Sequence, residues 1–332
     1  MDSSFNKLLN WFLSPKSIYV EKSEPWNIEV FAKSIASIAN CHGSSHYKEF
    51  DSSVPLSNFK KSDYSEPELK PILELYQYAN NNLKEYLVDF LIHGSVSTLD
   101  YSYGWSDLDT YLVIKYDVLS SADKLLNLRS HLIVAYNFLI DFDFHQHHGF
   151  IIISELDLHE YHNKLLPVEV LPYSKSLFHF SEFKYTRSST LYADTYMVKS
   201  ICNLFQSACE TGELRHHGLN GIYLEENFNN IYTMYQMKYF LSVVMTLPSY
   251  YYSDIGKPTY KKFSFQQIKN DLDLNFELLD KCSKIRLIWP TINQNILSRN
   301  MIPEELRVIL GPNYFSRAKK FSDELLQSIE GS

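Results

Sequence analysis

Two short stretches decide the fold: LIHGS at residues 91–95 and, after eleven further residues, DLDTYLVI at residues 107–114. The apolar run YLVDFLIH at residues 86–93 predicts a buried strand that ends at the Gly94–Ser95 pair. The alternating run DTYLVIK at residues 109–115 predicts a second strand. Polar residues therefore gather where the first strand ends and where the second begins.

The residue types at these two strand ends suit a phosphate group and a metal ion. Glycine has no Cβ, so the backbone at Gly94 can pass close to a phosphate, and Ser95 offers N–H and hydroxyl donors. Asp107 and Asp109 stand two positions apart on a strand, so their side chains point to the same face. Such a carboxylate pair can hold one or two Mg2+ ions, with waters and substrate phosphates in the other positions. Ions held there would favour an attacking alkoxide and a leaving pyrophosphate in an in-line displacement.

The same two stretches resemble the signature of the polymerase-beta nucleotidyltransferase superfamily, in which apolar-Gly-Ser is followed by Asp-apolar-Asp. The resemblance covers residues 91–114 directly. The segment 104–106 (GWS) before Asp107 is similar to the Gly-x-Ser-Asp-apolar-Asp form common in that superfamily, whereas Thr110 is less apolar than usual. A Gly-Ser turn and an Asp-x-Asp pair also occur by chance on ordinary surfaces, but their joint spacing at two strand ends favours a functional site.

The resemblance implies a metal-dependent enzyme whose substrate is a nucleoside triphosphate (NTP). Gly94, Ser95 and Ser106 would contact the triphosphate, and Asp107 and Asp109 would be the ligands of Mg2+ (or Mn2+). The group transferred would be a nucleoside monophosphate, AMP by family frequency. The acceptor would be a hydroxyl on a small molecule, a protein or an RNA end, and the sequence does not choose among these.

The superfamily usually supplies a third carboxylate, often the catalytic base, from a neighbouring strand. Before a third predicted strand at residues 150–154 (FIIIS), the segment 141–149 (DFDFHQHHG) offers Asp143 or Asp141 as that acid. His148 would take the strand position itself and could act as a ligand or as a general base, because imidazole titrates near neutral pH.

Other residues around this strand leave alternatives open. His145 and His147 are equally well explained as part of a solvated turn. Together with His148 they could hold a metal on a loop, but no Cys or distant His pair completes a recognised zinc pattern. Glu155 and Asp157, just after the strand, are further candidates for the third acid.

A basic segment in the C-terminal half suggests a phosphate contact. Residues 256–264 (GKPTYKKFS) place three lysines near hydroxyl groups. Enzymes of the superfamily often bring a lysine from a helical domain onto the β- and γ-phosphates, which would suit Lys257 or Lys261. Lysines on a solvated loop are the alternative interpretation.

The rest of the chain predicts an α+β domain followed by helices. The expected elements are helices at residues 27–40, about 67–86 and 122–140, a loop at 44–65, a strand at 177–183, and helices at 191–210, 224–247, 263–279, 303–310 and 315–329. The element order predicts an α+β domain with a mixed sheet, followed by an all-helical C-terminal domain. The resemblance implies that the first of these is an α/β-like nucleotidyltransferase palm. The expected divisions are an N-terminal helical and loop extension (1–65), the nucleotidyltransferase domain (66–186) and the helical domain (187–332).

Bulk composition narrows the class of protein. The 332 residues carry a net charge of -8 without a long Lys/Arg run, so there is no general nucleic-acid-binding signal. The four cysteines lack metal-ligand spacing, which makes a reducing, cytoplasmic setting the default expectation. No signal peptide is expected, and the apolar run at residues 239–252 contains Pro248 and is too short to cross a membrane.

Two other functions share the same residues. In a signalling-nucleotide synthase, the acceptor would be another nucleotide. In a non-catalytic nucleotide-binding or interaction protein, the fold would remain without the reaction, as the lack of an obvious third acid allows. The Asp107/Asp109 pair speaks against a pure binder, which has no need of two carboxylates that repel a triphosphate.

Overall fold

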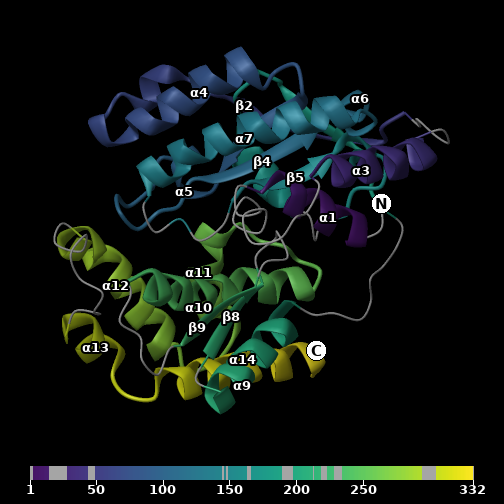
Figure 1. Cartoon of the computed structure of the whole chain (residues 1–332). Coiled ribbons are helices and arrows are strands. Elements are labelled where there is room, and N and C mark those ends of the chain that lie inside the picture. The colour runs from purple at the N-terminus through teal and green to yellow at the C-terminus, as the bar shows by residue number, and fades with distance from the viewer. Residues whose placement is uncertain are drawn as a thin grey trace. The chain divides into compact units, whose positions relative to one another are not determined.

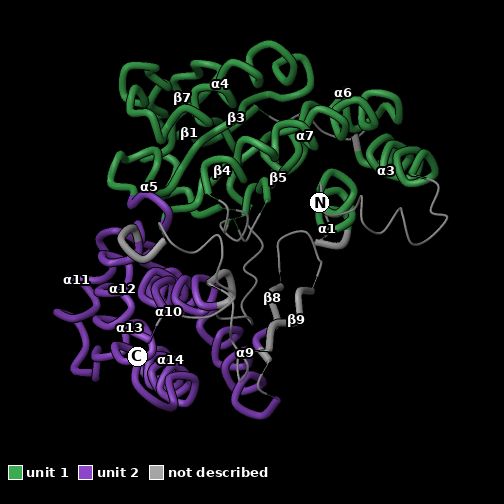
Figure 2. Tube along the Cα trace, turned by 60° about the vertical axis from the view of Figure 1, so that its left-hand side comes forward, with its two compact units in different colours: residues 1–101, 106–191, 217–222 green, residues 102–105, 192–216, 223–332 purple. Residues whose placement is uncertain are grey.

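The computed structural model divides the chain into two compact units, coloured separately in Figure 2 and labelled by element in Figure 1. The first unit contains residues 1–101, 106–191 and 217–222, and the second contains residues 102–105, 192–216 and 223–332. The structure describes residues 3–14, 28–43, 49–143, 146, 149–162, 166–188, 197–211, 213–217, 223–227, 234–293 and 304–331.

A mixed five-stranded sheet organises the first unit (Figure 1). In spatial order its strands are β2 (Ser57–Asn58), β6 (Lys175–Ser176), β3 (Leu87–His93), β4 (Asp109–Ile114) and β5 (Ile151–Ser154). β3 runs antiparallel to β4 and β6, whereas the β4–β5 and β2–β6 pairs are parallel. The three strands predicted around the two motifs are confirmed, and so is the helix between β4 and β5, α7 (Ala122–Phe142). A parallel pair requires such a crossover.

Helices pack on one face of this sheet. They are α1 (Ser3–Leu13), α3 (Ile28–Gly43), α4 (Lys70–Asn82) and α7. Their buried side chains form one hydrophobic cluster with Phe90 and Ile92 of β3 and with Leu112 and Ile114 of β4. These strand residues alternate along the chain, because successive side chains of a strand point to opposite faces.

The opposite face has its own, smaller core. Leu91 of β3 and Tyr111 and Val113 of β4 pack there against Tyr161 and Phe183. The covering elements are β1 (Ser52–Pro55), which pairs antiparallel with β7 (Glu182–Tyr185), and the short helices α8 (Glu155–Leu158) and η3 (Val168–Tyr173). Asp109 has the same strand parity as Tyr111, so its side chain belongs to this face.

The N-terminal helix α1 belongs to the larger core, on the helical face of the sheet. Asn10 of α1 donates from Nδ2 to the carbonyl oxygen of Ile152 at 2.9 Å and accepts from its N–H at 3.2 Å. It thereby occupies backbone groups on β5, the edge strand of the sheet. Arg129 of α7 donates from Nε to the carbonyl oxygen of Phe12 at 2.9 Å. α1 is thus held at its middle and at its end.

Several expectations for the first unit were wrong in detail. The expected loop at 44–65 contains β1, β2 and a 3-10 turn, η1 (Lys61–Tyr64). The strand expected at 177–183 is replaced by β6 before it and β7 across its end, and the helix expected at 67–86 comprises η2 (Pro67–Leu69) and α4, ending at Asn82. These strands are two to four residues long and pair with distant segments, so no local periodicity reveals them.

Helices dominate the second unit. They are α9 (Met197–Thr211), α10 (Met234–Asp254), α11 (Lys261–Asp271), α12 (Glu277–Asn293), α13 (Glu304–Leu310) and α14 (Tyr314–Glu330). They pack around a core that includes Phe205, Phe240, Trp289 and Leu325. The carboxylate of Asp254, at the end of α10, accepts from the first two backbone N–H groups of α9, both at 2.8 Å.

The prediction that the C-terminal half is all-helical was wrong. The strands β8 (Glu213–His217) and β9 (Tyr223–Asn227) form a two-stranded sheet, and the helix expected at 224–247 begins only at Met234. The sequence between these strands contains Asn220-Gly221, a common hairpin dipeptide. The helix expected at 263–279 is divided between α11 and α12, because Leu272 is extended (φ -126°, ψ 141°).

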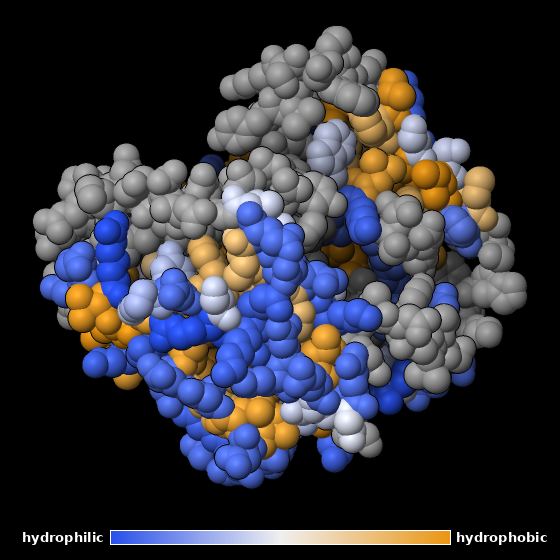
Figure 3. Space-filling model, turned by 90° about the horizontal axis from the view of Figure 1, so that it is seen from below, coloured by the Kyte–Doolittle hydropathy of each residue, from blue (hydrophilic) through white to orange (hydrophobic). Residues whose placement is uncertain are grey.

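The outer surface is largely hydrophilic where Figure 3 shows it, with hydrophobic residues in separate smaller areas. Within the described ranges, none of the helices combines the length and the apolar character that a membrane span needs.

Candidate functional site

The Gly-Ser turn follows directly from the end of β3. After His93 the chain enters a short helix, α5 (Gly94–Ser97). Gly94 has φ +70°, a left-handed conformation that residues with a side chain rarely adopt. A Cβ built on Gly94 would overlap Oδ2 of Asp109 and stand 3.1 Å from its Cγ. Glycine is therefore required here twice, by the backbone conformation and by the carboxylate that lies against it.

The antiparallel pairing of β3 and β4 explains this contact. The pairing places His93 opposite Asp109, so that Gly94 leaves β3 where Asp109 begins β4. Beside them, Ser95 Oγ donates to Ser106 Oγ at 3.0 Å. The structure thus brings together four predicted site residues from two motifs. His93, a buried imidazole on the strand position facing Asp109, was not singled out from the sequence.

Hydrogen bonds within unit 1 hold α5 in place. The Ser97 hydroxyl donates to the carbonyl oxygen of Tyr173 at 2.6 Å and also lies 2.9 Å from that of Gly94. The N–H of Asp100 donates to the carbonyl oxygen of Ser95 at 3.1 Å. The turn that carries the Gly-Ser pair is therefore bonded to Tyr173 and, within itself, to Asp100.

The Asp107-Leu108-Asp109 segment is anchored by its middle residue. The Leu108 side chain is fully buried in the core on the helical side of the sheet. Asp107 and Asp109, one position to either side, are half-buried and remain accessible to solvent. Because neighbouring side chains of an extended segment point to opposite sides, Asp107 and Asp109 lie on the side away from Leu108.

An unpredicted side chain, Gln146, binds the same segment. The N–H of Leu108 donates to Gln146 Oε1 at 3.2 Å, and Gln146 Nε2 donates to the carbonyl oxygen of Leu108 at 3.5 Å. Gln146 comes from the segment 141–149, in which the sequence drew attention to acids and imidazoles. A lone amide with no charge gives no sequence signal, although its place in a turn beside a buried strand would have been a reason to consider it.

Asp143 lies at the same end of the sheet as Asp109, because β5 runs parallel to β4 and the turn containing Asp143 precedes β5. Asp143 ends α7 and is 2% exposed. Its N–H donates to the carbonyl oxygen of Leu139 at 2.9 Å. Asp141 lies on an exposed part of α7. The predicted residue His148, with His145 and His147, lies outside the described residues.

No residue of β5 is paired with Asp109. The β4–β5 ladder begins with Tyr111 beside Ile151, the first residue of β5, and β5 carries no acid along its length. Among the residues that the structure describes, no group of three or more His, Cys, Asp or Glu side chains is placed to hold a metal ion. Among the described residues at this end of the sheet, Asp107, Asp109 and Asp143 are carboxylates that the sequence put forward.

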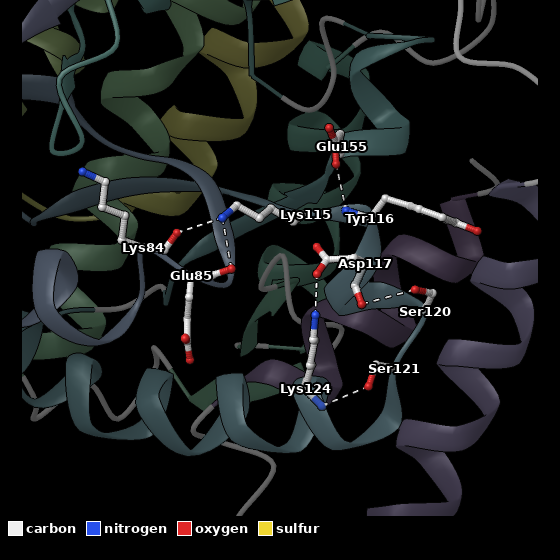
Figure 4. Close-up of polar contacts among 9 residues, drawn as sticks. All are labelled: Lys84, Glu85, Lys115, Tyr116, Asp117, Ser120, Ser121, Lys124 and Glu155. Carbon is white, nitrogen blue, oxygen red and sulfur yellow. Dashed lines mark hydrogen bonds and ion pairs between the residues drawn. The ribbon is translucent and has the colours of Figure 1, made fainter.

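Glu155 and Asp157 are removed from consideration as a third acid. Both follow the far end of β5, and β4 has six residues, so they lie about 17 Å or more along the sheet from Asp109. Glu155 accepts there from the N–H of Tyr116 at 2.9 Å (Figure 4). Asp157 accepts from the N–H and Oγ of Ser154 at 2.8 and 2.6 Å. Each carboxylate caps a short helix, which explains its position.

Lys257 and Lys261 belong to the second unit. Both side chains are exposed, Lys257 in the turn after α10 and Lys261 at the first position of α11. The N–H of Lys257 donates to the carbonyl oxygen of Tyr252 at 2.8 Å, which shapes that turn. A contact of either lysine with a phosphate stays a prediction.

The two aspartate carboxylates suit a divalent ion that prefers oxygen ligands. Gly94 leaves room for the Asp109 carboxylate that a Cβ would displace. Asp107 stands two residues before Asp109 in the chain and is half-buried as Asp109 is. Two carboxylates are too few for a metal held by protein alone, but Mg2+ commonly binds through one or two carboxylates together with waters and substrate phosphates. The residues present therefore suit Mg2+ that binds together with a triphosphate.

No protein-family model matches the chain, and comparisons with curated proteins and with solved structures return no match. The geometry of Gly94, Ser95, Ser106 and the aspartate pair is therefore the feature of the molecule that bears on its function.

Proposed function

We propose that the protein is a metal-dependent nucleotidyltransferase, and that its first unit is the palm-like domain in which an NTP binds. The observation that carries this proposal is the contact between Gly94 and the Asp109 carboxylate. It joins the Gly-Ser turn and the Asp-x-Asp pair, which are separated by eleven residues in the sequence, into one half-buried site.

In this proposal the residues divide into two groups. Gly94 and Ser95, with Ser106 behind them, receive the triphosphate through backbone N–H groups and hydroxyls. Asp107 and Asp109 hold Mg2+ or Mn2+. The metal, when bound with the NTP, neutralises phosphate charge in the displacement. The donor expected from the resemblance is ATP, and the acceptor is a hydroxyl of a small molecule, a protein or an RNA end.

The proposal assigns two further roles. Asp143 or His148 would take the proton from the acceptor hydroxyl, Asp143 being supported by its position at the correct end of the sheet. Lys257 or Lys261 of the second unit would bind the β- and γ-phosphates. Variants of each residue in the assay below test these roles.

The direct test uses each of the four α-labelled NTPs with Mg2+ or Mn2+ and cell extract as the source of acceptors. Label is then sought on protein, RNA and small molecules, and pyrophosphate is measured. Pyrophosphate release by wild type and its loss in Asp107→Ala and Asp109→Ala would support the proposal. NTP binding that needs no metal, without pyrophosphate release under any condition, would exclude the enzyme.

Two glycines offer a matched pair of variants that test the contact between Gly94 and the Asp109 carboxylate. Gly94 and Gly256 have φ +70° and +73°, so alanine at either position meets a similar backbone penalty, about 1 kcal/mol. A Cβ at Gly256 meets nothing within 4 Å, whereas at Gly94 it displaces Asp109. Gly94→Ala should therefore abolish pyrophosphate release, and Gly256→Ala should leave it near wild type. Equal activity of both variants would contradict a site formed by Gly94 and Asp109.

The sequence of β5 favours a second candidate function. The strand, Ile151–Ser154, carries no carboxylate, whereas the superfamily usually supplies its third from a neighbouring strand, so the unit could bind a nucleotide without catalysing transfer. A binder would retain an NTP with micromolar to millimolar affinity and release no pyrophosphate with any acceptor. A signalling-nucleotide synthase would instead release pyrophosphate with nucleotides as the only acceptors, and product analysis would identify it.

A further inference from the structure

The amide of Gln146 binds both peptide groups that connect the two aspartates. The N–H that it accepts from, at 3.2 Å, belongs to the Asp107–Leu108 peptide. The carbonyl oxygen that it donates to, at 3.5 Å, belongs to the Leu108–Asp109 peptide. One side chain therefore spans the backbone between the proposed metal ligands, in the way that a neighbouring strand would.

This contact restricts the aspartate pair. Asp107 precedes the first residue of β4, so the strand ladder itself does not hold it. The Leu108 side chain is buried, and the Gln146 amide adds hydrogen bonds to the peptide groups on both sides of the Leu108 Cα. With both peptide groups bound by Gln146, the backbone from which the two aspartate side chains extend is held before any ligand arrives.

Gln146 is itself firmly held. It is 4% exposed, and its N–H donates to the carbonyl oxygen of Asp143 at 3.0 Å. Asp143 in turn is bonded to the last turn of α7. Because the Gln146 amide is buried and bonded to Leu108 through both its oxygen and its nitrogen, it is poorly placed to touch a substrate, and its effect would pass through the backbone.

We infer that Gln146 is a positioning residue for the divalent metal, which it serves by holding Asp107 and Asp109 in one fixed relative orientation. The inference rests on the proposed function and adds to it a residue that binds neither metal nor nucleotide. Loss of the contact should weaken metal binding and leave the triphosphate contacts of the Gly-Ser turn unchanged. Partners that orient metal ligands commonly change metal affinity by roughly 10–100-fold.

The chain supplies a matched control for the test. Asn10 also binds the N–H and the carbonyl oxygen of one residue, Ile152, with a buried amide, but on the outer edge of β5. Gln146→Met and Asn10→Leu each replace an amide by an apolar group of similar size. Both should lower stability to a similar extent, and only the first touches the segment between the aspartates. Gln146→Asn provides a milder variant, because its side chain is one methylene shorter and its amide should no longer reach both peptide groups from position 146.

The measurement is Mn2+ binding, followed by electron paramagnetic resonance, in the presence of a non-hydrolysable α,β-methylene NTP analogue. Urea unfolding of each variant identifies those that are folded. We expect Gln146→Met and Gln146→Asn to weaken Mn2+ binding by roughly tenfold, with Asn10→Leu at the wild-type value. Analogue binding without metal should be the same in all of them, which a general loss of structure would not produce.

Two results would overturn different statements. If wild type binds Mn2+ through Asp109, as shown by Asp109→Ala, but Gln146→Asn and Asn10→Leu both bind it as wild type does, the role of Gln146 is refuted and the proposed function stands. If Mn2+ binding with the analogue is no stronger in wild type than in Asp109→Ala, the proposed function fails first. Equal weakening in Gln146→Asn and Asn10→Leu would indicate a structural role only and would also refute the inference.

Discussion

A buried carboxyl group in β3 should make the first unit less stable as the pH rises from acidic to neutral. Asp89 is 4% exposed. Burial raises its pKa to about 6 from the ordinary 3.8, against the opposing hydrogen bonds from Ser176 and the backbone of Phe90 and Phe178. The Ser176 hydroxyl and the Phe90 N–H donate to Oδ1 at 2.8 and 2.7 Å, while Oδ2 is buried without a hydrogen-bond partner.

The size and sign of the effect follow from the two pKa values of Asp89. The folded protein holds this proton more tightly than the unfolded chain, so the stabilisation is complete below about pH 4 and is lost as the pH rises through about 6. A difference of about two pKa units corresponds to roughly 3 kcal/mol. This contribution of Asp89 to the free energy of unfolding should therefore be lost between about pH 4 and pH 7.

Asp89→Asn removes the charge and keeps the oxygen that Ser176 and Phe90 bind. At neutral pH the variant should be more stable than wild type by roughly 1–3 kcal/mol, the lower value applying if the new NH2 group is left without an acceptor. At about pH 4 the two proteins should differ little, because wild-type Asp89 is then protonated. Urea unfolding across this pH range, together with hydrogen exchange of the β3 amides, measures the difference.

Asp63 provides a control of opposite sign. The hydrogen bond from Lys175, which is 2.9 Å away, lowers the pKa of Asp63. Its stabilising contribution is therefore present above the pKa of the unfolded chain and is lost as the pH falls. Asp63→Asn should accordingly be the less stable protein at neutral pH. A wild-type minus Asp89→Asn difference that stays constant between about pH 4 and pH 7 would refute the argument for Asp89.

Three further variants test hydrogen bonds that lie within one unit or the other. Asn10→Leu should lower the free energy of unfolding by about 1–3 kcal/mol, because two backbone groups of Ile152 lose a buried partner; an unchanged urea midpoint would contradict this. Asp254→Asn should cost about 1–2 kcal/mol in thermal unfolding, since one of the two N–H groups at the start of α9 loses its acceptor. Lys115→Met should cost about 1 kcal/mol, because Nζ donates to two carbonyl oxygens just before β3, both at 3.0 Å (Figure 4); a wild-type melting temperature would count against it.

The central part of the first unit was predictable from local patterns. The runs at residues 86–93, 109–115 and 150–154 are long enough to show apolar alternation or a continuous buried core, and each became a strand. The helix at 122–140 was equally clear and extends to Phe142. The glycine of the turn was also predictable, because a close approach to the backbone requires a residue without Cβ.

Edge strands and turns were not predictable in this way. β1 pairs with β7 so that Ser52 lies opposite Tyr185, and β2 pairs with β6 so that Ser57 lies opposite Lys175. Strands of two to four residues show no periodicity, and their stability comes from partners that are distant in sequence. β9 overlaps the start of the helix expected at 224–247, and β8 lies between the two helices expected at 191–210 and 224–247, where no strand was predicted.

The sequence by itself determined which residues form the Gly-Ser turn and the aspartate pair, because residue type and strand alternation are local properties. Only the tertiary structure decided which other residues meet them. The antiparallel ladder set Asp109 against Gly94, and the parallel ladder carried Glu155 to the far end of the sheet. The turn before β5 returned Gln146 to Leu108 across 38 residues. Such contacts depend on strand direction and packing, which no short stretch of sequence contains.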